Sequence, residues 1–245
     1  MIFVHSIVLS MIQGISEFLP ISSSGHLNLA QYFLKLTPSL TLDIFLNTAT
    51  FVSVLFFFRH KLSYFFKNLP YIIVGSIPAG LVGILLKHQF EAITGNIKLL
   101  PFFFLITSAF VFSTKFIKNK SSKPVNLTYK KSLIIGLFQA FAILPAVSRS
   151  GSTIFAGLLT GLSTEEAFNF SFCLFIPASL GAVILSAKDL SGSNFLSSEY
   201  LLAFVLTFLV GILALNLLKK ILIGKKFWIF GVYTFILALI LFFII

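Results

Sequence analysis

Long apolar runs, separated by short polar connectors, dominate the chain from end to end. A helix needs about 20 apolar residues to cross a bilayer, and six runs approach or reach that length: 44–58, 70–86, 100–117, 168–187, 200–218 and 227–245. The first run is short for a full span, so we expect its helix to begin somewhat earlier. The pattern predicts an all-α polytopic membrane protein.

Two further apolar segments are interrupted by residues that break helices. Segment 2–36 is broken at 20–25, which reads Pro-Ile-Ser-Ser-Ser-Gly, and segment 132–162 is broken at 145–153, which is rich in Ser and Gly after its Pro. Each break leaves two arms of about a dozen residues, which are too short to span. We therefore expect two re-entrant helix–loop–helix hairpins, whose non-helical backbone needs protein or a water-filled cavity around it.

The two hairpins repeat each other in sequence. Gln13 and Gln139 lie 126 residues apart, and segments 22–25 and 148–151 keep the same offset. A Leu-Pro pair also precedes each break. These matches predict an internal duplication.

The duplication predicts a single membrane domain, 1–245, made of repeat one (about 1–120) and repeat two (about 127–245). Each half holds one hairpin and three transmembrane helices. Because three is odd, the second half lies inverted in the membrane relative to the first. Transporters with such inverted-topology repeats bind their substrates near the midplane, where broken helices meet.

Composition agrees with a membrane protein. Hydrophobic residues make up 58% of the chain and charged residues only 10%, whereas a soluble domain is about half apolar and about a quarter charged. This composition excludes a soluble enzyme, a disordered tail and a nucleic-acid-binding module. The single cysteine, Cys173, excludes an intrachain disulfide and a cysteine-based metal site.

The net charge of +11 comes largely from cations in the connectors. Of the 18 Lys and Arg residues, 13 follow the runs at 44–58, 100–117 and 200–218, four lie on the other connectors, and Arg149 lies inside the second hairpin. Lys and Arg concentrate on the cytoplasmic side of membrane proteins. We therefore expect both termini to face outward.

Glu17, His26 and Arg149 are ionisable groups inside the hairpins. Such a group at membrane depth costs at least a few kcal/mol, which makes each one a candidate for function. Taken singly, they also fit an interfacial acid, a satisfied buried imidazole and a snorkelling cation. Hydroxyl side chains accompany them in both breaks: Ser22, Ser23, Ser24, Ser148, Ser150, Ser152 and Thr153.

Phosphate is the ligand that these residue types favour. Serine and glycine at the start of a helix leave N–H groups free for an anion, and Gly25 and Gly151 allow close approach of the backbone. Arg149 offers a planar fork of donors that suits phosphate oxygens. Glu17 can bind a divalent cation or act as a base, and His26 can shuttle a proton or attack phosphorus.

Oxygen side chains at helical spacing are candidates for cation binding. Gln13 lies four residues before Glu17, so both face one cavity, and Gln13 adds oxygen ligation without charge. Asp43 and Asn47 repeat this spacing. The sequence leaves open whether Asp43 is a second cation ligand or an interfacial helix cap.

Two motifs resemble those of a known family. Segment 13–26, QGISEFLPISSSGH, resembles the (E/Q)xxxE and SSxGH motifs of bacterial undecaprenyl-diphosphatases of the bacitracin-resistance type, and segment 144–153, LPAVSRSGST, resembles their PGxSRSxxT motif. The resemblance covers essentially the whole chain. Gln13 stands where many members have a carboxylate, and Ala146 stands where the second motif usually has glycine.

The resemblance implies a multi-pass enzyme of the bacterial inner membrane that removes the terminal phosphate of undecaprenyl diphosphate, with a site open to the outer face. It also implies a divalent cation, Mg²⁺ or Ca²⁺. The expected partners are the lipid substrate and membrane lipids but no nucleic acid, and a homodimer is left open. The expected site has catalytic Glu17, Ser23, His26 and Arg149; substrate-binding Ser22, Ser24, Gly25, Ser148, Ser150, Gly151 and Thr153; and metal-binding Glu17, Gln13 and Asp43.

Three alternatives accompany this hypothesis. Ser23 is the expected nucleophile, and His26 is its close competitor. A lipid-phosphate transporter or flippase would use the same inverted repeat. An ion channel is disfavoured, because the sequence has no ring of charge or filter-like motif.

Overall fold

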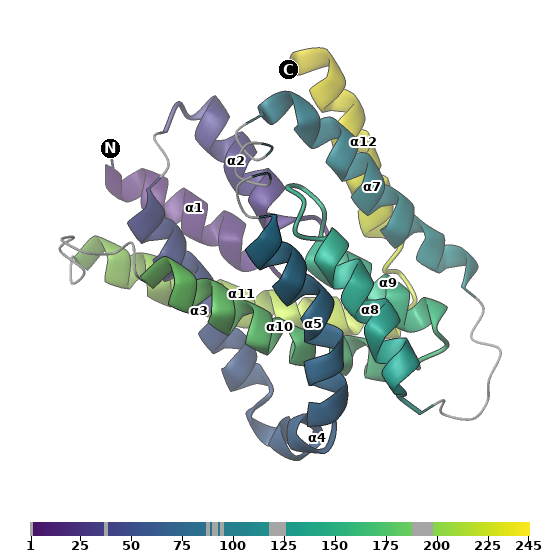
Figure 1. Ribbon diagram of the computed structural model, residues 1–245. Helices are drawn as coiled ribbons and strands as arrows, with labels where there is room; N and C mark the ends of the chain where they lie inside the picture. Colours follow the sequence, from purple (N-terminus) through teal and green to yellow (C-terminus); the bar gives the residue numbers. More distant parts are fainter. Residues whose placement is uncertain are drawn as a thin grey trace.

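The computed structural model describes residues 2–36, 39–86, 89, 93, 96–117, 126–187 and 198–245, and every regular element in this part of the chain is a helix (Figure 1). The α-helices are α1 (Ile2–Ser16), α2 (Ser23–Phe33), α3 (Leu40–Phe57), α4 (Leu62–Lys67), α5 (Leu69–Leu85), α7 (Leu100–Ser113), α8 (Tyr129–Phe141), α9 (Arg149–Leu159), α10 (Thr164–Ala187), α11 (Ser198–Ile223) and α12 (Ile229–Ile244). Three short 3₁₀ helices, η1 (Arg59–Lys61), η2 (Ile97–Leu99) and η3 (Thr114–Phe116), flank them. Five of the cations behind the predicted orientation lie outside the described residues: Lys87, Lys118, Lys120, Lys123 and Lys188.

Both predicted helix breaks are confirmed. The first separates α1 from α2, and the second separates α8 from α9. Each second arm begins at a serine cap: Ser22 Oγ accepts the Gly25 N–H at 3.4 Å, and Ser148 Oγ accepts the Gly151 N–H at 3.1 Å. A capping oxygen satisfies an N–H group that has no partner in the first turn. The serines therefore fix where each helix restarts after its Leu-Pro pair.

The predicted spans differ in length. Within the described ranges, three helical stretches are long and apolar enough to cross a membrane: Ile97–Phe116, Thr164–Ile184 and Ser198–Ile223. The first predicted span does begin earlier than residue 44, and α3 passes the same test together with η1 and α4 across a bend of 56°. The other two predicted spans, α5 and α12, are apolar but have only 17 and 16 residues. The apolar pattern therefore predicted these helices correctly: α5 has the same length as its run at 70–86, whereas α12 is shorter than its run at 227–245.

The bundle hides polar side chains and exposes apolar ones. Large apolar side chains such as Ile84, Leu213 and Phe243 face outward, the last with 90% of its surface exposed. Gln13 and Thr207, in contrast, are buried. Extensive apolar surface marks a membrane or protein contact, and together with the long apolar helices it identifies a membrane protein.

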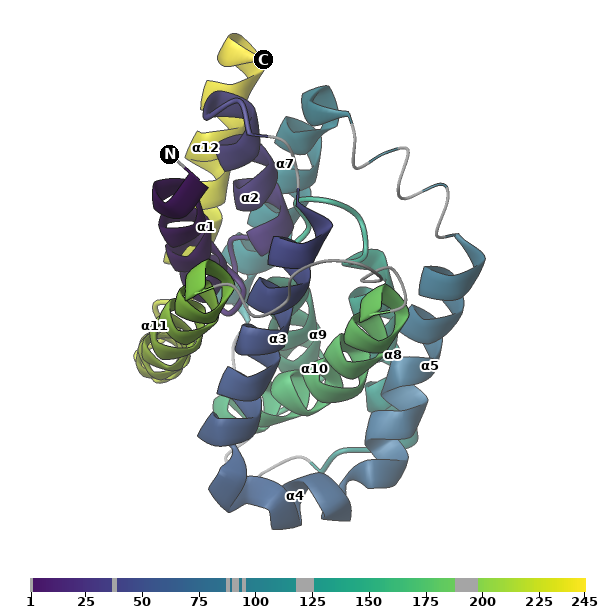
Figure 2. The same ribbon diagram turned by 90° about the vertical axis from the view of Figure 1, so that its left-hand side faces the viewer.

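Helices far apart in sequence pack as pairs. α1 lies against α11, α5 against α8, α7 against α12, and α3 against both α10 and α11. Figure 2 shows α10 between α3 and α5, with α4 joining the lower ends of those two helices. The largest apolar core contains Phe18 of the first break together with Phe58, Phe168 and Phe172. This core fixes α10 next to the first break.

Candidate active site

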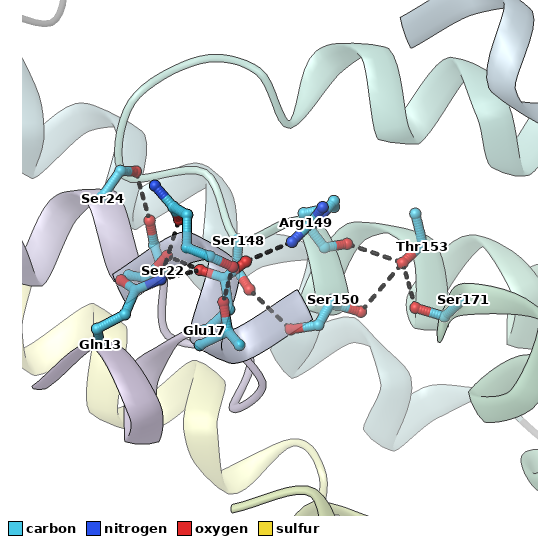
Figure 3. A network of polar contacts seen from close by, with 12 residues as sticks. Gln13, Glu17, Ser22, Ser24, Ser148, Arg149, Ser150, Thr153 and Ser171 are labelled. Carbon is cyan, nitrogen blue, oxygen red and sulfur yellow. Dashed lines mark hydrogen bonds and ion pairs between the residues drawn. The ribbon is translucent and has the colours of Figure 1, made fainter. Parts of the chain in front are cut away.

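Glu17 is the centre of a polar cluster between the two breaks (Figure 3). Its carboxylate accepts hydrogen bonds from Ser23 Oγ, from Arg149 Nη2 and, at 3.2 Å, from Gln13 Nε2. Ser23 is the first residue of α2 and Arg149 the first residue of α9. The structure thus brings four of the predicted site residues together, and Arg149 joins them from the second half of the sequence, 132 residues after Glu17.

The Glu17–Arg149 ion pair is largely removed from solvent. Only 10% of the Glu17 side chain and 24% of the Arg149 side chain are exposed. The guanidinium also lies over the Phe175 ring, with its Cζ atom 4.0 Å from the ring centroid, in a cation–π contact that fixes its plane. Guanidinium has five N–H donors, and among the described residues Glu17 accepts only one of them. The remaining donors are available to an anion.

Glu17 and Arg149 line one cavity of about 580 Å³. The first break and its neighbours contribute Ser16, Ser22, Ser23, Ser24 and Asn47, and the second contributes Gln139, Ala142, Ile143, Val147 and Ser148. Residues of α5 and α10 complete the wall. The two hairpin tips therefore share this cavity, as the sequence predicts. Its polar end carries the Glu17 carboxylate, the Arg149 guanidinium and several hydroxyl groups.

Hydrogen bonds from side chains hold the second break in shape. Thr107 of α7 donates its hydroxyl to the Ala146 carbonyl at 2.8 Å and accepts the Ser148 N–H at 2.9 Å. Ser24 Oγ accepts the Ala146 N–H at 3.3 Å, which links the two breaks directly. Unsatisfied backbone groups are costly inside a membrane, so these bonds make the non-helical loop possible. Thr107 was not predicted, because one threonine in an apolar helix is not distinctive.

Ala146 adopts a conformation that usually belongs to glycine. Its φ is +57°, in the left-handed region, and it is fully buried. That region costs a residue with a Cβ roughly 1–2 kcal/mol. Ala146 therefore departs from the second motif in residue type, but its backbone has the left-handed conformation that glycine favours.

Three residues of the second motif that were predicted to contact phosphate do not line the cavity: Ser150, Gly151 and Thr153. Thr153 instead donates to the Arg149 carbonyl at 2.8 Å and contacts Ser171 Oγ of α10 at 2.6 Å. These residues fasten the start of α9 to its neighbours, and Ser171 was not predicted.

The two predicted glycines of the breaks are packing positions in this structure. A Cβ on Gly25 would lie 2.5 Å from Phe104 Cζ and 2.9 Å from the Ala146 Cβ. A Cβ on Gly151 would lie 2.9 Å from Val111 Cγ2. Protein atoms therefore occupy the space that glycine leaves free.

His26 lies outside the Glu17 cluster and does not line the cavity. Its Nδ1 is 2.7 Å from the Ser22 carbonyl oxygen, and its Nε2 is 2.8 Å from the Tyr233 hydroxyl of α12. Its ring stacks on Tyr233 and meets Phe104 edge-on. Both ring nitrogens are thus occupied by groups that fix the orientation of the imidazole, and Tyr233 was not predicted.

A second hollow of about 200 Å³ adjoins the cluster and is lined by Gln13, Ser23, Ser24, Leu27, Asn28, Gln31, Asp43 and Asn47. Gln13 donates its amide to Asn47 Oδ1 at 3.1 Å, but Gln13 Oε1 and Asp43 Oδ1 are buried and have no hydrogen-bond partner among the residues that the structure describes. Divalent Mg²⁺ and Ca²⁺ prefer oxygen ligands of these types. The donor set therefore fits a hard cation, although the described residues contain no group of three or more His, Cys, Asp or Glu side chains.

Comparison with known proteins gives full-length similarities. The sequence-family model described as "Bacitracin resistance protein BacA" matches residues 6–240. The undecaprenyl-diphosphatase of Thermosipho africanus is 40% identical over 98% of this chain and 99% of that protein. Those of Thermosipho melanesiensis (39% identical, 95% of this chain and 96% of that protein) and Methanococcus vannielii (36%, 98% and 100%) are similar over comparable lengths.

Proposed function

Because the chain belongs to the bacitracin resistance protein BacA family, we propose that it is a membrane phosphatase that hydrolyses undecaprenyl diphosphate to undecaprenyl phosphate and inorganic phosphate. This reaction recycles the lipid carrier of cell-wall synthesis. The observation that carries the proposal is the convergence of Glu17, Ser23 and Arg149 on one cavity from two separate helix breaks.

Ser23 is the proposed nucleophile, with Glu17 as its base. The Ser23 hydroxyl already donates to Glu17, so its proton passes to the carboxylate as Oγ attacks the terminal phosphorus. A bond forms between Oγ and phosphorus, and the bond from phosphorus to the bridging oxygen breaks. Undecaprenyl phosphate leaves. Water then attacks the phosphorus of the phosphoserine, the bond from phosphorus to Ser23 Oγ breaks, and the proton held by Glu17 returns to Oγ, which restores the serine hydroxyl and releases inorganic phosphate.

Arg149 neutralises the phosphoryl oxygens in this scheme. The N–H groups of Arg149 that Glu17 does not accept can donate to the oxygens of the phosphoryl group under attack. Donors held in place in this way stabilise the charge of the transition state most effectively in a site without water. Phe175 fixes the plane of the guanidinium, and Glu17 holds its position before substrate arrives. The ion pair therefore keeps both groups aimed at the same point.

A divalent cation, Mg²⁺ or Ca²⁺, would be held by Gln13 and Asp43 at the second hollow, with Asn47 beside them. When bound, it supplies positive charge next to the phosphate-binding cluster. Glu17, the third predicted ligand, does not line this hollow, but its carboxylate accepts a hydrogen bond from the amide of Gln13, which does. Gln13 thus connects the cation-binding residues to the base.

His26 is the alternative nucleophile, and the two cases are separable by trapping. We assign His26 a positioning role, because its ring nitrogens contact the Ser22 carbonyl oxygen and the Tyr233 hydroxyl and His26 itself does not line the cavity. Rapid quenching with terminally labelled substrate should leave acid-stable label on Ser23. Acid-labile label on His26 would reverse the assignment, and label on neither residue would indicate direct attack by water.

The fold proposed for this activity is an inverted repeat with both termini outward and the site open to the outer face. The packing supports it: α1 of the first half packs against α11 of the second, and in the same way α8 of the second half packs against α5 of the first. Both hairpins also break after their first arm. Both chain ends lie at the same end of the bundle (Figure 2). Labelling of cysteines introduced near each terminus in intact cells, with a reagent that cannot cross the membrane, tests the orientation.

Phosphate release by the purified protein in detergent tests the activity. With undecaprenyl diphosphate, release should occur, stop on addition of a chelator and be lost in Glu17→Gln. Glu199→Gln is a suitable control, because Glu199 contacts Ser6 away from the cavity. Lipid binding without any release would instead support the transporter alternative.

A further inference from the structure

The cavity continues beyond the catalytic cluster into a space between α5 and α10. Small residues form most of its walls there, Ala79, Gly80 and Gly83 on α5 and Ala178, Gly181 and Ala182 on α10, and Ser76, Ile84 and Pro177 complete them. We call this space the α5–α10 corridor. None of the steps described above uses it.

The corridor glycines are not required by helix packing. A Cβ on Gly80 or Gly181 would meet no atom within 4 Å, and one on Gly83 would meet only Ile143 Cδ1 at 3.8 Å. At the crossing of α5 and α8, in contrast, a Cβ on Gly136 would lie 2.2 Å from the Gly75 carbonyl oxygen. Glycine inside a helix costs roughly 0.5–1 kcal/mol relative to alanine. Glycine at these positions therefore destabilises the helices relative to alanine, and no close contact among the described residues requires it. Its effect is to keep the corridor open.

Gln139 supplies an independent sign of a ligand in this cavity. Its side chain is only 2% exposed and lines the cavity, yet neither its Oε1 nor its Nε2 has a hydrogen-bond partner within the described part of the chain. Its counterpart in the first hairpin, Gln13, donates to Glu17, whereas the position four residues after Gln139 is Ile143. A buried amide left without partners costs about 1–3 kcal/mol. A polar group from a bound molecule would satisfy it.

The position of Gln139 connects the corridor to the catalytic cluster. α5 runs along α8 beside α10 (Figure 1), and the Gly75–Gly136 crossing places the following turns of α5 next to the end of α8. Gln139 lies on that end of α8, just before the break that carries Arg149. The cavity thus combines an ionic end, one neutral amide and an apolar corridor.

We propose that the α5–α10 corridor seats the first prenyl units of the lipid diphosphate and that Gln139 hydrogen-bonds the phosphate that stays on the lipid. This proposal rests on the proposed function. The groups of a prenyl diphosphate follow the same order as the parts of the cavity. Its terminal phosphate corresponds to the ionic end, its second phosphate to the neutral amide, and its apolar chain to the corridor. A neutral donor at the second phosphate suits turnover, because it binds the departing monophosphate less strongly than a cation would.

Filling the corridor tests where the chain lies. Gly80→Phe and Gly181→Phe place a ring in open space, and Leu81→Phe is the matched control, since Leu81 lies on the same helix with 55% of its surface exposed. The ratio of kcat/KM for farnesyl diphosphate to that for dimethylallyl diphosphate should fall at least about tenfold in the two glycine variants. It should stay at the wild-type value in Leu81→Phe. Unchanged ratios in both glycine variants would overturn the corridor assignment.

Gln139→Leu tests the second phosphate. The inhibition constant of farnesyl phosphate should rise about tenfold, as expected for loss of one hydrogen bond in a buried site, while that of inorganic phosphate should stay within about twofold. A purely structural role would move both constants together, and that result, or no change in either, would reject the contact. If the wild-type protein released no phosphate from any lipid diphosphate, the proposed function itself would fail; wild-type activity with unaltered selectivity would refute this inference alone.

Discussion

Arg149→Lys is the substitution that most directly tests the proposed site. Lysine keeps the positive charge that Glu17 requires but loses the planar fork and the flat contact with Phe175. The change therefore separates charge from geometry. In the structure the guanidinium donates to Glu17 and lies 4.0 Å over the Phe175 ring, so both features depend on its shape.

The expected loss follows from these contacts. Removing one preorganised donor from a developing oxyanion costs about 10²–10³ in kcat, and a desolvated cation–π contact is worth up to about 2 kcal/mol. We expect kcat/KM for undecaprenyl diphosphate to fall by about 10²–10³. The protein should still fold, because an ammonium group can remain paired with Glu17 and no unpaired buried charge is created.

Arg59→Lys is a matched control for this experiment. Arg59 also lies over an aromatic ring, with its Cζ atom 4.2 Å from the Phe56 centroid, and donates to a backbone carbonyl, but it is exposed and does not line the cavity. Phosphate release should be measured in detergent on equal amounts of monodisperse protein. Arg59→Lys should match the wild type, and Arg149→Lys activity within threefold of wild type would refute the role assigned to the guanidinium.

Three further predictions test other parts of the site. Ser23→Ala should lower phosphate release by about 10³-fold or more, since it removes the attacking oxygen. Asp43→Asn should raise the Mg²⁺ concentration for half-maximal rate by about tenfold or more, and an unchanged metal titration would exclude Asp43. Gly25→Ala should destabilise the protein by about 1–3 kcal/mol, because its Cβ would lie 2.5 Å from Phe104 Cζ; a lower thermal midpoint in detergent, partly restored by adding Phe104→Leu, checks this.

The sequence predicted the breaks and several residues of the site because their signals are local. Proline and capping serines interrupt a helix wherever it lies. A carboxylate and a guanidinium at membrane depth are candidates for function, so Glu17 and Arg149 were expected to share one site, but their direct ion pair was not predicted. The apolar pattern likewise predicted helices, and α5 matches the length of its run, but α12 is shorter than its run at 227–245.

The supporting contacts were not predictable from the sequence. Thr107, Ser171 and Tyr233 are ordinary residues in apolar helices, and their roles arise only where those helices pack against a break. The same holds for Gly25, which resembles a phosphate-loop glycine in sequence but packs against Phe104. The sequence pattern shows which residues carry reactive or polar groups. Which other side chains those groups contact depends on how distant helices pack together.

The contact between His26 and Tyr233 also constrains how the protein is made. One partner lies in the first hairpin and the other in the final helix, α12. Chains emerge from the ribosome N-terminus first, so the first hairpin enters the membrane long before the helix that orients its imidazole. The complete arrangement is assembled only when translation has nearly finished, and a chain that stops before α12 would carry every residue of the Glu17 cluster without that final brace.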